Sequence, residues 1–144
     1  MIRNTRTEID LKAFGHNIRL IRERLSPGTR LMAVVKANAY GHGIERIAHY
    51  ACDHGADSLA VAIAEEGVKL RNAGITLPIL ILGTSLPEHL PQILEYDLTP
   101  AVFSVDFLHA LQNAASAAGK QVRFHFKIDT GMGRIGFTDL KEFE

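Results

Sequence analysis

The sequence predicts an α/β protein built on a parallel sheet, and three observations lead to this class. Short apolar runs that suit strands alternate along the 144 residues with segments of helical apolar spacing. Successive strand and helix pairs recur about every 22–28 residues, which is typical of βαβ units. These units share no sequence identity of the kind that indicates a solenoid. Because parallel strands joined by short segments need a crossover helix, the pattern favours a parallel sheet covered by helices.

An open doubly wound sheet and a (β/α)8 barrel both fit this alternation. A complete barrel needs roughly 250 residues, whereas this sequence has 144. We therefore expect either a small open domain or about half of a barrel. A further helix is predicted to begin near Thr138, and the sequence ends inside it, which favours a barrel that has been cut.

The first helix and the first strand are the clearest elements. Leu11, Phe14 and Ile18 begin an apolar stripe at helical spacing that predicts a helix over residues 11–25, with Asp10 as its N-cap. Residues 31–35 form a continuous apolar run that is too short for a helix. Such a run predicts a strand buried on both faces.

The later elements follow the same alternation. A helix from residue 44 places Ile44, Ile47, Ala48 and Ala51 on one face. The remaining predictions are strands at 58–62, 79–82, 98–102 and 121–128 and helices at 64–72, 87–95 and 105–118.

The charge balance argues against nucleic acid or an anionic membrane as a partner. Basic and acidic residues number 16 each, so the formal net charge is zero. Lys12, Arg19 and Arg22 are spaced as on a solvated helix face. No apolar stretch is long enough to cross a membrane, and the first ten residues lack the apolar stretch of a secretory signal. The single cysteine, Cys52, favours a reducing compartment, so we expect a soluble, cytoplasmic protein.

In a parallel α/β sheet the functional loops follow the carboxyl ends of the strands. The first strand ends at Lys36, where burial favours the neutral amine that imine formation with an aldehyde requires. The alternative is a lysine that extends its amine to solvent. Tyr40 follows in a loop at residues 39–43, whose glycines allow close approach to a phosphate. His42 in this loop is interpreted as a turn or helix-start residue and not as an acid–base group.

The second such loop follows the strand at 121–128 and carries Lys127, Asp129 and Arg134 among three glycines. A fixed guanidinium suits a phenolate or a carboxylate, because its planar fork donates paired hydrogen bonds. The alternatives are that Arg134 is an ordinary residue of a glycine loop and that Lys127 forms a structural ion pair with Asp129 or another strand-end acid.

Other combinations carry less weight. The tripeptide Asp-Thr-Gly at 129–131 occurs in aspartic proteases, but those folds are all-β. His49, Cys52, Asp53 and His54 gather at one helix end without further ligands at metal spacing, so we predict a solvated face and no metal site. A thiol in mid-helix suits packing better than nucleophilic catalysis. No strand is followed by a Walker loop or by GxGxxG, so a nucleotide cofactor is not indicated.

Two long motifs closely resemble the alanine racemase family: VVKANAYGHG at residues 34–43 and KIDTGMGRIG at residues 127–136. The segment TEIDL at 7–11 is also similar, as is LAVA at 59–62 with the Glu-Glu-Gly that follows it. The resemblance therefore covers the whole chain with its motifs in family order. The second motif is also similar in cofactor-homeostasis proteins and in other racemases of this fold type, and the first motif favours alanine.

The resemblance implies that residues 1–144 are the N-terminal half of a barrel that binds pyridoxal 5'-phosphate, with the rest of the barrel and a C-terminal β domain absent. By matching positions, Lys36 would hold the cofactor and exchange the α-proton of D-alanine, and Tyr40 would hydrogen-bond the cofactor phosphate. Arg134 would contact the phenolic oxygen of the cofactor and the substrate carboxylate. Leu82 would line the cofactor ring, and Lys127 matches a lysine that is carbamylated in several members and positions that arginine.

The implied activity is the interconversion of L-alanine and D-alanine by a homodimeric isomerase that supplies D-alanine for peptidoglycan. Racemisation requires bases on both faces of a planar carbanion. In the family the base opposite the lysine is a tyrosine of the partner subunit's β domain, and Tyr50 and Tyr96 do not match its context. Two interpretations stay open: an N-terminal fragment of an alanine racemase, and a catalytically inactive half barrel that binds a cofactor or a partner.

Overall fold

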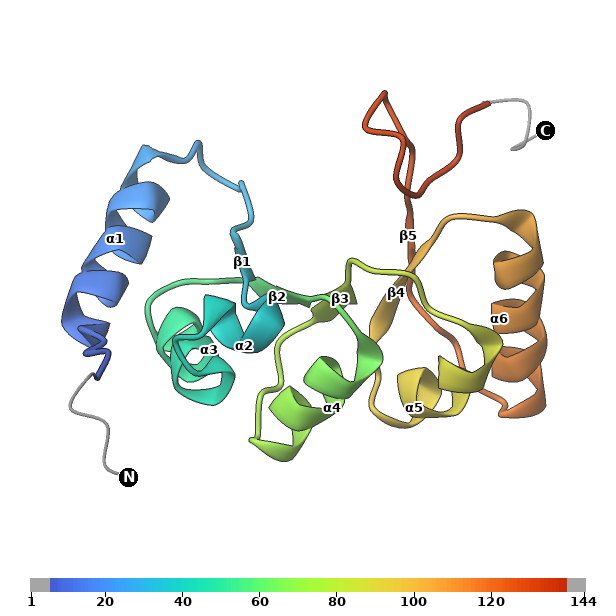
Figure 1. Ribbon diagram of the computed structural model, residues 1–144, viewed down its shortest axis with the longest axis horizontal. Coiled ribbons are helices and arrows are strands. Elements are labelled where there is room, and N and C mark those ends of the chain that lie inside the picture. Colours follow the sequence, from blue (N-terminus) through green and yellow to red (C-terminus); the bar gives the residue numbers. More distant parts are fainter. Residues whose placement is uncertain (1–5, 140–144) are drawn as a thin grey trace.

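The computed structural model describes residues 6–139 and shows a single five-stranded sheet with helices between its strands (Figure 1). The strands are β1 (Met32–Val34), β2 (Ser58–Val61), β3 (Ile79–Ile81), β4 (Thr99–Val102) and β5 (His125–Phe126). The helices are α1 (Leu11–Arg24), α2 (Lys36–Tyr40), α3 (Ile44–Asp53), α4 (Ala64–Asn72), α5 (Leu90–Glu95) and α6 (Val105–Ala117), and a 3-10 turn, η1 (Pro87–His89), precedes α5. The predicted alternation of strands and helices is confirmed.

The order of the strands distinguishes the two folds that the sequence left open. All strand pairs are parallel, and β1 to β5 neighbour one another in chain order. A doubly wound sheet reverses its strand order at a switch point, whereas a (β/α)8 barrel adds each strand beside the previous one. The sheet therefore has the topology of the N-terminal portion of a (β/α)8 barrel.

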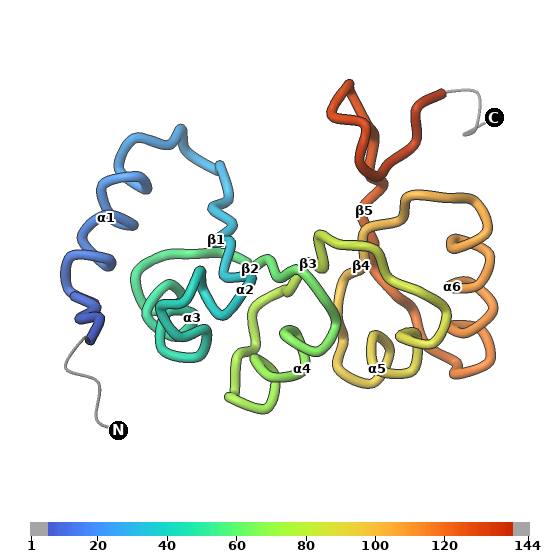
Figure 2. The backbone as a smooth tube through the Cα atoms, viewed as in Figure 1, coloured from blue at the N-terminus to red at the C-terminus, as the bar shows by residue number. Residues whose placement is uncertain are grey.

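Helices α3, α4, α5 and α6 pack one beside the next along one side of the sheet (Figure 1). Helix α3 buries the face that its spacing predicts: Ile44, Ile47, Ala48 and Ala51. Helix α1 lies at the β1 end of the molecule, where it contacts α3 (Figure 2). Asp10 is its N-cap, as predicted, and its carboxylate accepts hydrogen bonds from two amides of the first turn.

The hydrophobic core lies between the sheet and these helices. Leu59 of β2, Ile79 and Ile81 of β3 and Ile93 of α5 have no solvent exposure. Burial of an apolar side chain of this size contributes about 1.5–3 kcal/mol. The core therefore holds the strand ends, and the segments that follow them, in fixed positions.

The opposite face of the sheet is more open than the sequence predicts. Strand β1 is predicted to be buried on both faces, but Val34 is 43% exposed and Phe126 of β5 is 46% exposed. In a complete barrel the inward-facing side chains of all eight strands fill the interior. Only five strands are present in the described residues, so this part of the barrel interior is uncovered.

Two predicted elements differ in extent from those observed. The last strand is predicted over 121–128, but only His125–Phe126 pair with β4. At its C-terminal end the strand stops because Ile128 pairs with Phe137 at the base of the following loop. The helix predicted over 87–95 starts as a 3-10 turn. The α-helix cannot begin at Pro87 because Pro91 has no amide hydrogen to donate to the Pro87 carbonyl four residues earlier.

Arg22 corrects the prediction of a solvated basic face on α1. Its guanidinium donates hydrogen bonds to the Asp57 carboxylate at 2.8 Å and to the Thr29 carbonyl at 2.8 Å. The backbone amide of Leu31 also donates to that carboxylate, at 2.6 Å. These bonds, the Leu31 bond first, lower the pKa of Asp57. They join the end of α1 to the starts of β1 and β2.

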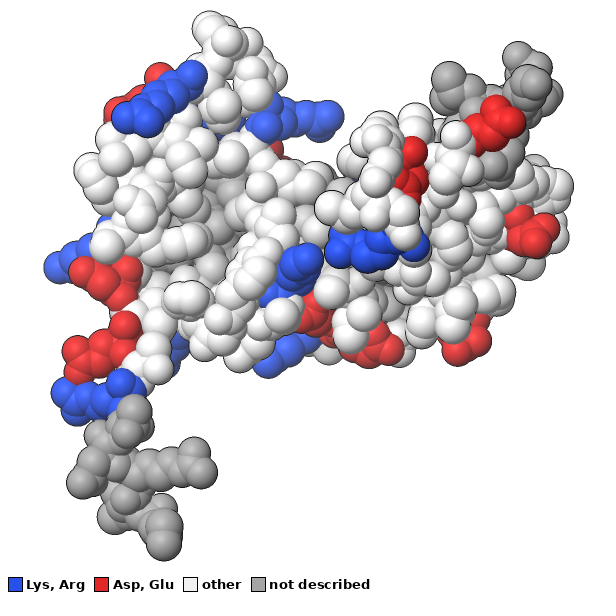
Figure 3. Space-filling view, turned by 45° about the horizontal axis from the view of Figure 1, so that its top comes forward, with Lys and Arg blue, Asp and Glu red and all other residues white. Residues whose placement is uncertain are grey.

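Charged side chains of both signs are interspersed over the face seen in Figure 3. Between residues 6 and 139, no helix is both long enough and apolar enough to span a membrane. The helix predicted to begin near Thr138 falls mainly on residues 140–144, which lie outside the described residues.

Candidate active site

Because the strands are parallel, the segments that follow them gather at one edge of the sheet. A hollow of about 280 Å³ lies at this edge. Lys36 from the segment after β1, Leu82 from the segment after β3 and Arg134 from the loop after β5 all line it. The structure therefore brings together three of the residues that the sequence singled out.

The charged side chains that line this hollow are basic. Besides Lys36 and Arg134, its lining consists of neutral residues: Ala62, Leu82, Gly83, Thr84 and Ile135. No Asp or Glu is among the described residues that line it. Two basic side chains without an acidic neighbour favour an anionic ligand, such as a carboxylate, phenolate or phosphate.

One wall of the hollow requires glycine. The amide of Gly83 donates to the carbonyl of Ala62 at 3.0 Å, which continues the pairing of β2 and β3 past their ends. A Cβ atom at Gly83 would lie 2.3 Å from that carbonyl oxygen, closer than any real contact. Only glycine therefore allows the two backbones to approach closely beside Leu82.

The segment α2, which begins at Lys36, has an unusual backbone and is not an ordinary right-handed helix. Its residues Ala37, Asn38, Ala39 and Tyr40 have φ angles of 52°, 54°, 53° and 55°, so four consecutive non-glycine residues form one left-handed turn. Each such residue costs roughly 1–2 kcal/mol relative to the right-handed conformation. The sequence predicted a loop at residues 39–43 and missed this turn, which begins at residue 37.

Hydrogen bonds hold this left-handed turn in place. The amide of Ala39 donates to the Val35 carbonyl at 2.8 Å, and the amide of Gly43 donates to the Asn38 carbonyl at 3.0 Å. The Asn38 side-chain oxygen accepts from the amide of Ile44 at 2.9 Å, at the start of α3. Nδ1 of His42 lies 2.8 Å from the Ala39 carbonyl oxygen, so His42 is a turn residue, as predicted.

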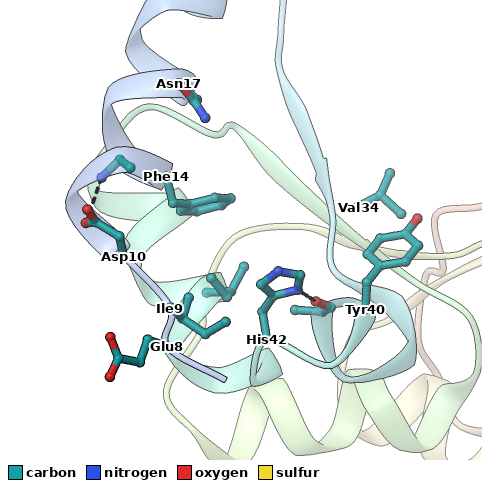
Figure 4. Close-up of a pocket in the computed structure, with 11 residues that line it drawn as sticks. Glu8, Ile9, Asp10, Phe14, Asn17, Val34, Tyr40 and His42 are labelled. Carbon is teal, nitrogen blue, oxygen red and sulfur yellow. Dashed lines mark hydrogen bonds between the residues drawn. The ribbon is translucent and has the colours of Figure 1, made fainter. Parts of the chain in front are cut away.

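Tyr40 lies at a neighbouring hollow rather than in the one that contains Lys36. This second hollow, of about 380 Å³, is enclosed by the start of α1, β1 and α2. Figure 4 shows the Tyr40 ring beside Val34, with Phe14 and Asn17 of α1 across the hollow. Tyr40 is 62% exposed, so its hydroxyl group is accessible.

The loop that carries Arg134 is organised by the Asp129 carboxylate. Its Oδ1 accepts hydrogen bonds from the amides of Gly131 at 2.8 Å and Gly133 at 3.0 Å, and its Oδ2 accepts from the amide of Arg134 at 3.0 Å. These backbone bonds, the one from Gly133 first, lower the pKa of Asp129. An ionised Asp129 therefore fixes the backbone at Arg134.

Two backbone hydrogen bonds close the same loop at its base. The amide of Asp129 donates to the Phe137 carbonyl at 2.9 Å, and the amide of Phe137 donates to the Lys127 carbonyl at 2.8 Å. Phe137 is only 3% exposed and belongs to the core. The loop is therefore anchored to the core directly after Gly136.

Lys127 follows β5 and is half-buried, and its backbone amide donates to the Val102 carbonyl at 2.8 Å. The sequence left open a structural ion pair between Lys127 and Asp129. The Asp129 carboxylate binds loop amides instead, and no ion pair of Lys127 is found in residues 6–139.

The cluster at the end of α3 has no metal-site geometry. No group of His, Cys, Asp and Glu in the described part of the chain is arranged to hold a metal ion. Nε2 of His49 lies 2.9 Å from the Ala73 carbonyl oxygen, and the His54 ring stacks on Tyr50 with 4.3 Å between ring centroids. Burial, with a smaller contribution from Asp53, raises the pKa of the Cys52 thiol, which disfavours a reactive thiolate.

Sequence reasoning missed one side chain that supports the backbone around the site. Glu66 of α4 accepts hydrogen bonds from the amides of Asn38 at 3.3 Å and Ala62 at 2.8 Å. A glutamate at the third position of a helix is a common cap of backbone amides, which was the available signal. The second partner, Asn38, lies 28 residues earlier and has no local sequence signature.

Fold and hollow together define a partial (β/α)8 barrel with a basic site at the carboxyl edge of its strands. The alanine racemase, N-terminal domain, family model matches residues 9–144. The chain belongs to this family.

Individual relatives agree with the family model. The alanine racemase of Methanococcus maripaludis is 45% identical over 134 residues, which are 93% of this chain and 36% of the relative. A crystal structure of alanine racemase from E. faecalis superposes with a TM-score of 0.89 at 40% identity, covering 94% of this chain and 37% of that chain. Alanine racemase from Bacillus anthracis with bound L-Ala-P gives a TM-score of 0.87 at 38% identity, covering 93% and 34%. The chain thus spans just over a third of the length of its relatives.

Proposed function

We propose that the chain is the N-terminal, cofactor-binding part of a pyridoxal 5'-phosphate-dependent alanine racemase. The observation that carries the proposal is the hollow that both Lys36 and Arg134 line, with no Asp or Glu among its described lining residues. A primary amine is the group that attaches covalently to the cofactor aldehyde. Family membership supports the proposal, as does the relative whose structure holds L-Ala-P.

The side chains at the strand ends fit this cofactor chemically. Lys36 supplies the amine, Leu82 offers an apolar side chain to the ring, and Arg134 offers a planar pair of donors to the phenolic oxygen. Tyr40, which lies at the neighbouring hollow, would supply an exposed hydroxyl group for the phosphate. When bound, the cofactor supplies an electron sink that makes the α-proton of an amino acid removable.

Arg134 and Lys36 would then have different roles in racemisation. Arg134 would hold the substrate carboxylate, with its backbone fixed by Asp129. The Lys36 amine would remove and return the α-proton on one face of the substrate. Among the described residues lining the hollow there is no second base for the opposite face, so we propose that the full-length homodimer supplies it.

Further roles are proposed for the full-length protein on the same basis. It would act in the cytoplasm and supply D-alanine for peptidoglycan. Lys127 would be carbamylated: addition of carbon dioxide to its neutral amine, with release of one proton, would form an anionic carbamate and give Arg134 a partner of opposite charge.

The proposal is tested by measuring racemisation in the full-length protein loaded with pyridoxal 5'-phosphate. We expect conversion of L-alanine to D-alanine and the reverse, and we expect Lys36→Ala to abolish both directions. Lys12→Ala, which removes an exposed lysine from α1, is the matched control and should retain activity. A folded, cofactor-loaded protein without racemisation would contradict the proposal and favour cofactor binding without catalysis.

A further inference from the structure

Glu66 connects two segments that meet at the candidate active site. It is the third residue of α4 and is half-buried. Its Oε1 accepts a hydrogen bond from the amide of Asn38 at 3.3 Å, and its Oε2 accepts one from the amide of Ala62 at 2.8 Å. Both oxygens of one carboxylate are therefore used to join the segment after β1 to the segment after β2.

Both of these segments border Lys36. Asn38 lies two residues after Lys36, inside the left-handed turn. Ala62 lines the same hollow as Lys36. The Glu66 carboxylate therefore fixes the backbone after the lysine relative to the wall that the lysine side chain shares.

The turn needs such support because its conformation is intrinsically unfavourable. Four consecutive non-glycine residues with positive φ persist only where the surroundings over-determine the backbone. Asn38 is held on its amide by Glu66 and on its side-chain oxygen by the amide of Ile44. Loss of the Glu66 bonds leaves the amides of Asn38 and Ala62 without these acceptors and frees the turn to relax.

We propose that Glu66 is a positioning residue for Lys36, which acts by fixing the left-handed turn that follows this lysine. The proposal deepens the proposed function of the same site and rests on it. A relaxed turn moves the Lys36 backbone, and a displacement of about 1 Å in a reacting group lowers a rate by about 100-fold. Glu66 itself does not line the hollow.

The first test measures the turn itself, by hydrogen exchange in the full-length protein. Glu66→Ala should speed exchange of the amides in residues 37–43 by about ten- to hundred-fold, as expected for loss of hydrogen bonds to a charged group. Glu65→Ala is the matched control, because Glu65 is exposed in the same helix turn and makes no hydrogen bond to residues 37–43 in the described structure. Equal exchange in Glu66→Ala and wild type would overturn the proposal.

The second test measures covalent capture of pyridoxal 5'-phosphate by Lys36, trapped with borohydride and located by peptide mapping. Glu66→Ala should slow capture by about ten- to hundred-fold and lower kcat more than it raises KM for alanine. Glu65→Ala should stay within about two-fold of wild type. A merely structural role would lower the unfolding midpoint and leave the capture rate of folded molecules unchanged, which would overturn the proposal.

Two further variants test the proposal independently of whether Glu66→Ala folds well. Glu66→Gln retains one acceptor oxygen and should give an intermediate capture rate, and it replaces Glu66→Ala if that variant does not fold. Ala37→Gly added to Glu66→Ala should restore part of the capture rate, because glycine adopts positive φ without strain. If wild type captures no cofactor at Lys36, the proposed function fails, and hydrogen exchange still decides whether Glu66 fixes the turn.

Discussion

Gly136 is the position where a single methyl group should open the loop that carries Arg134. Its φ is +136°, and a Cβ atom there would lie 2.7 Å from the Asp129 amide nitrogen and 2.9 Å from the Lys127 carbonyl oxygen. These two atoms belong to the hydrogen bonds that close the loop at Phe137. We therefore expect Gly136→Ala to separate the base of the loop.

The magnitude follows from two contributions. A non-glycine residue at this φ costs of order 1–3 kcal/mol. Loss of the two closing hydrogen bonds costs about 0.5–1.5 kcal/mol each, or roughly 1–3 kcal/mol together. The free energy of unfolding should therefore fall by about 2–6 kcal/mol in Gly136→Ala.

Gly131→Ala is the matched control for backbone strain. Gly131 lies in the same loop with φ of +126°, and a Cβ atom there would meet nothing within 4 Å. The free energy of unfolding of this variant should fall only by the cost of backbone strain, about 1–3 kcal/mol. The assay is urea unfolding of the full-length protein at neutral pH. Equal losses of stability in the two variants would refute the argument that the clash opens the loop.

Three further predictions concern single side chains. Arg134→Lys keeps the charge but loses the planar fork, so the rate of racemisation by the full-length protein should fall by about one to three orders of magnitude. This fall corresponds to a loss of roughly 1.4–4 kcal/mol of transition-state stabilisation. An unaltered rate would show that Arg134 is only a loop residue. The pKa of Asp129 is lowered in the folded state, so its stabilising effect is complete above the usual carboxyl pKa of about 4 and is lost as the pH falls through the lower folded value. Unfolding of wild type followed in urea should thus depend more steeply on acid pH than that of Asp129→Asn, and parallel curves would contradict this. The Cys52 thiol, whose pKa is raised by burial, should react with iodoacetamide at pH 8 more slowly than an unfolded control does, and Cys52→Ser should keep full activity.

Much of the fold could be predicted because its signals are local. The helical spacing of apolar residues predicts the buried face of α3, and all four of these residues are buried: Ile44, Ile47, Ala48 and Ala51. A continuous apolar run indicated β3, which is buried throughout. The mixed polar and apolar residues of 121–128 could not show where pairing begins and stops, so the predicted last strand is longer than β5.

Part of the candidate site could be predicted from local signals, and part of it could not. The positions of Lys36 and Arg134 could be predicted because Lys36 directly follows an apolar run and Arg134 lies in the glycine loop after the last strand, and parallel strands bring such segments to one edge. The left-handed turn could not be predicted, because Ala37 and Asn38 are ordinary residues whose conformation is held by a carboxylate from α4. The same holds for Arg22, whose partner Asp57 lies 35 residues away.

The most direct test of the central claim is to locate the cofactor on the chain. The full-length protein is loaded with pyridoxal 5'-phosphate, reduced with borohydride and digested, and the modified peptide is sequenced by mass spectrometry. The account predicts one reduced pyridoxyl group, on Lys36, because this is the lysine that lines the basic hollow with Arg134. A pyridoxyl group on any other lysine, or none on a folded and loaded protein, would contradict it.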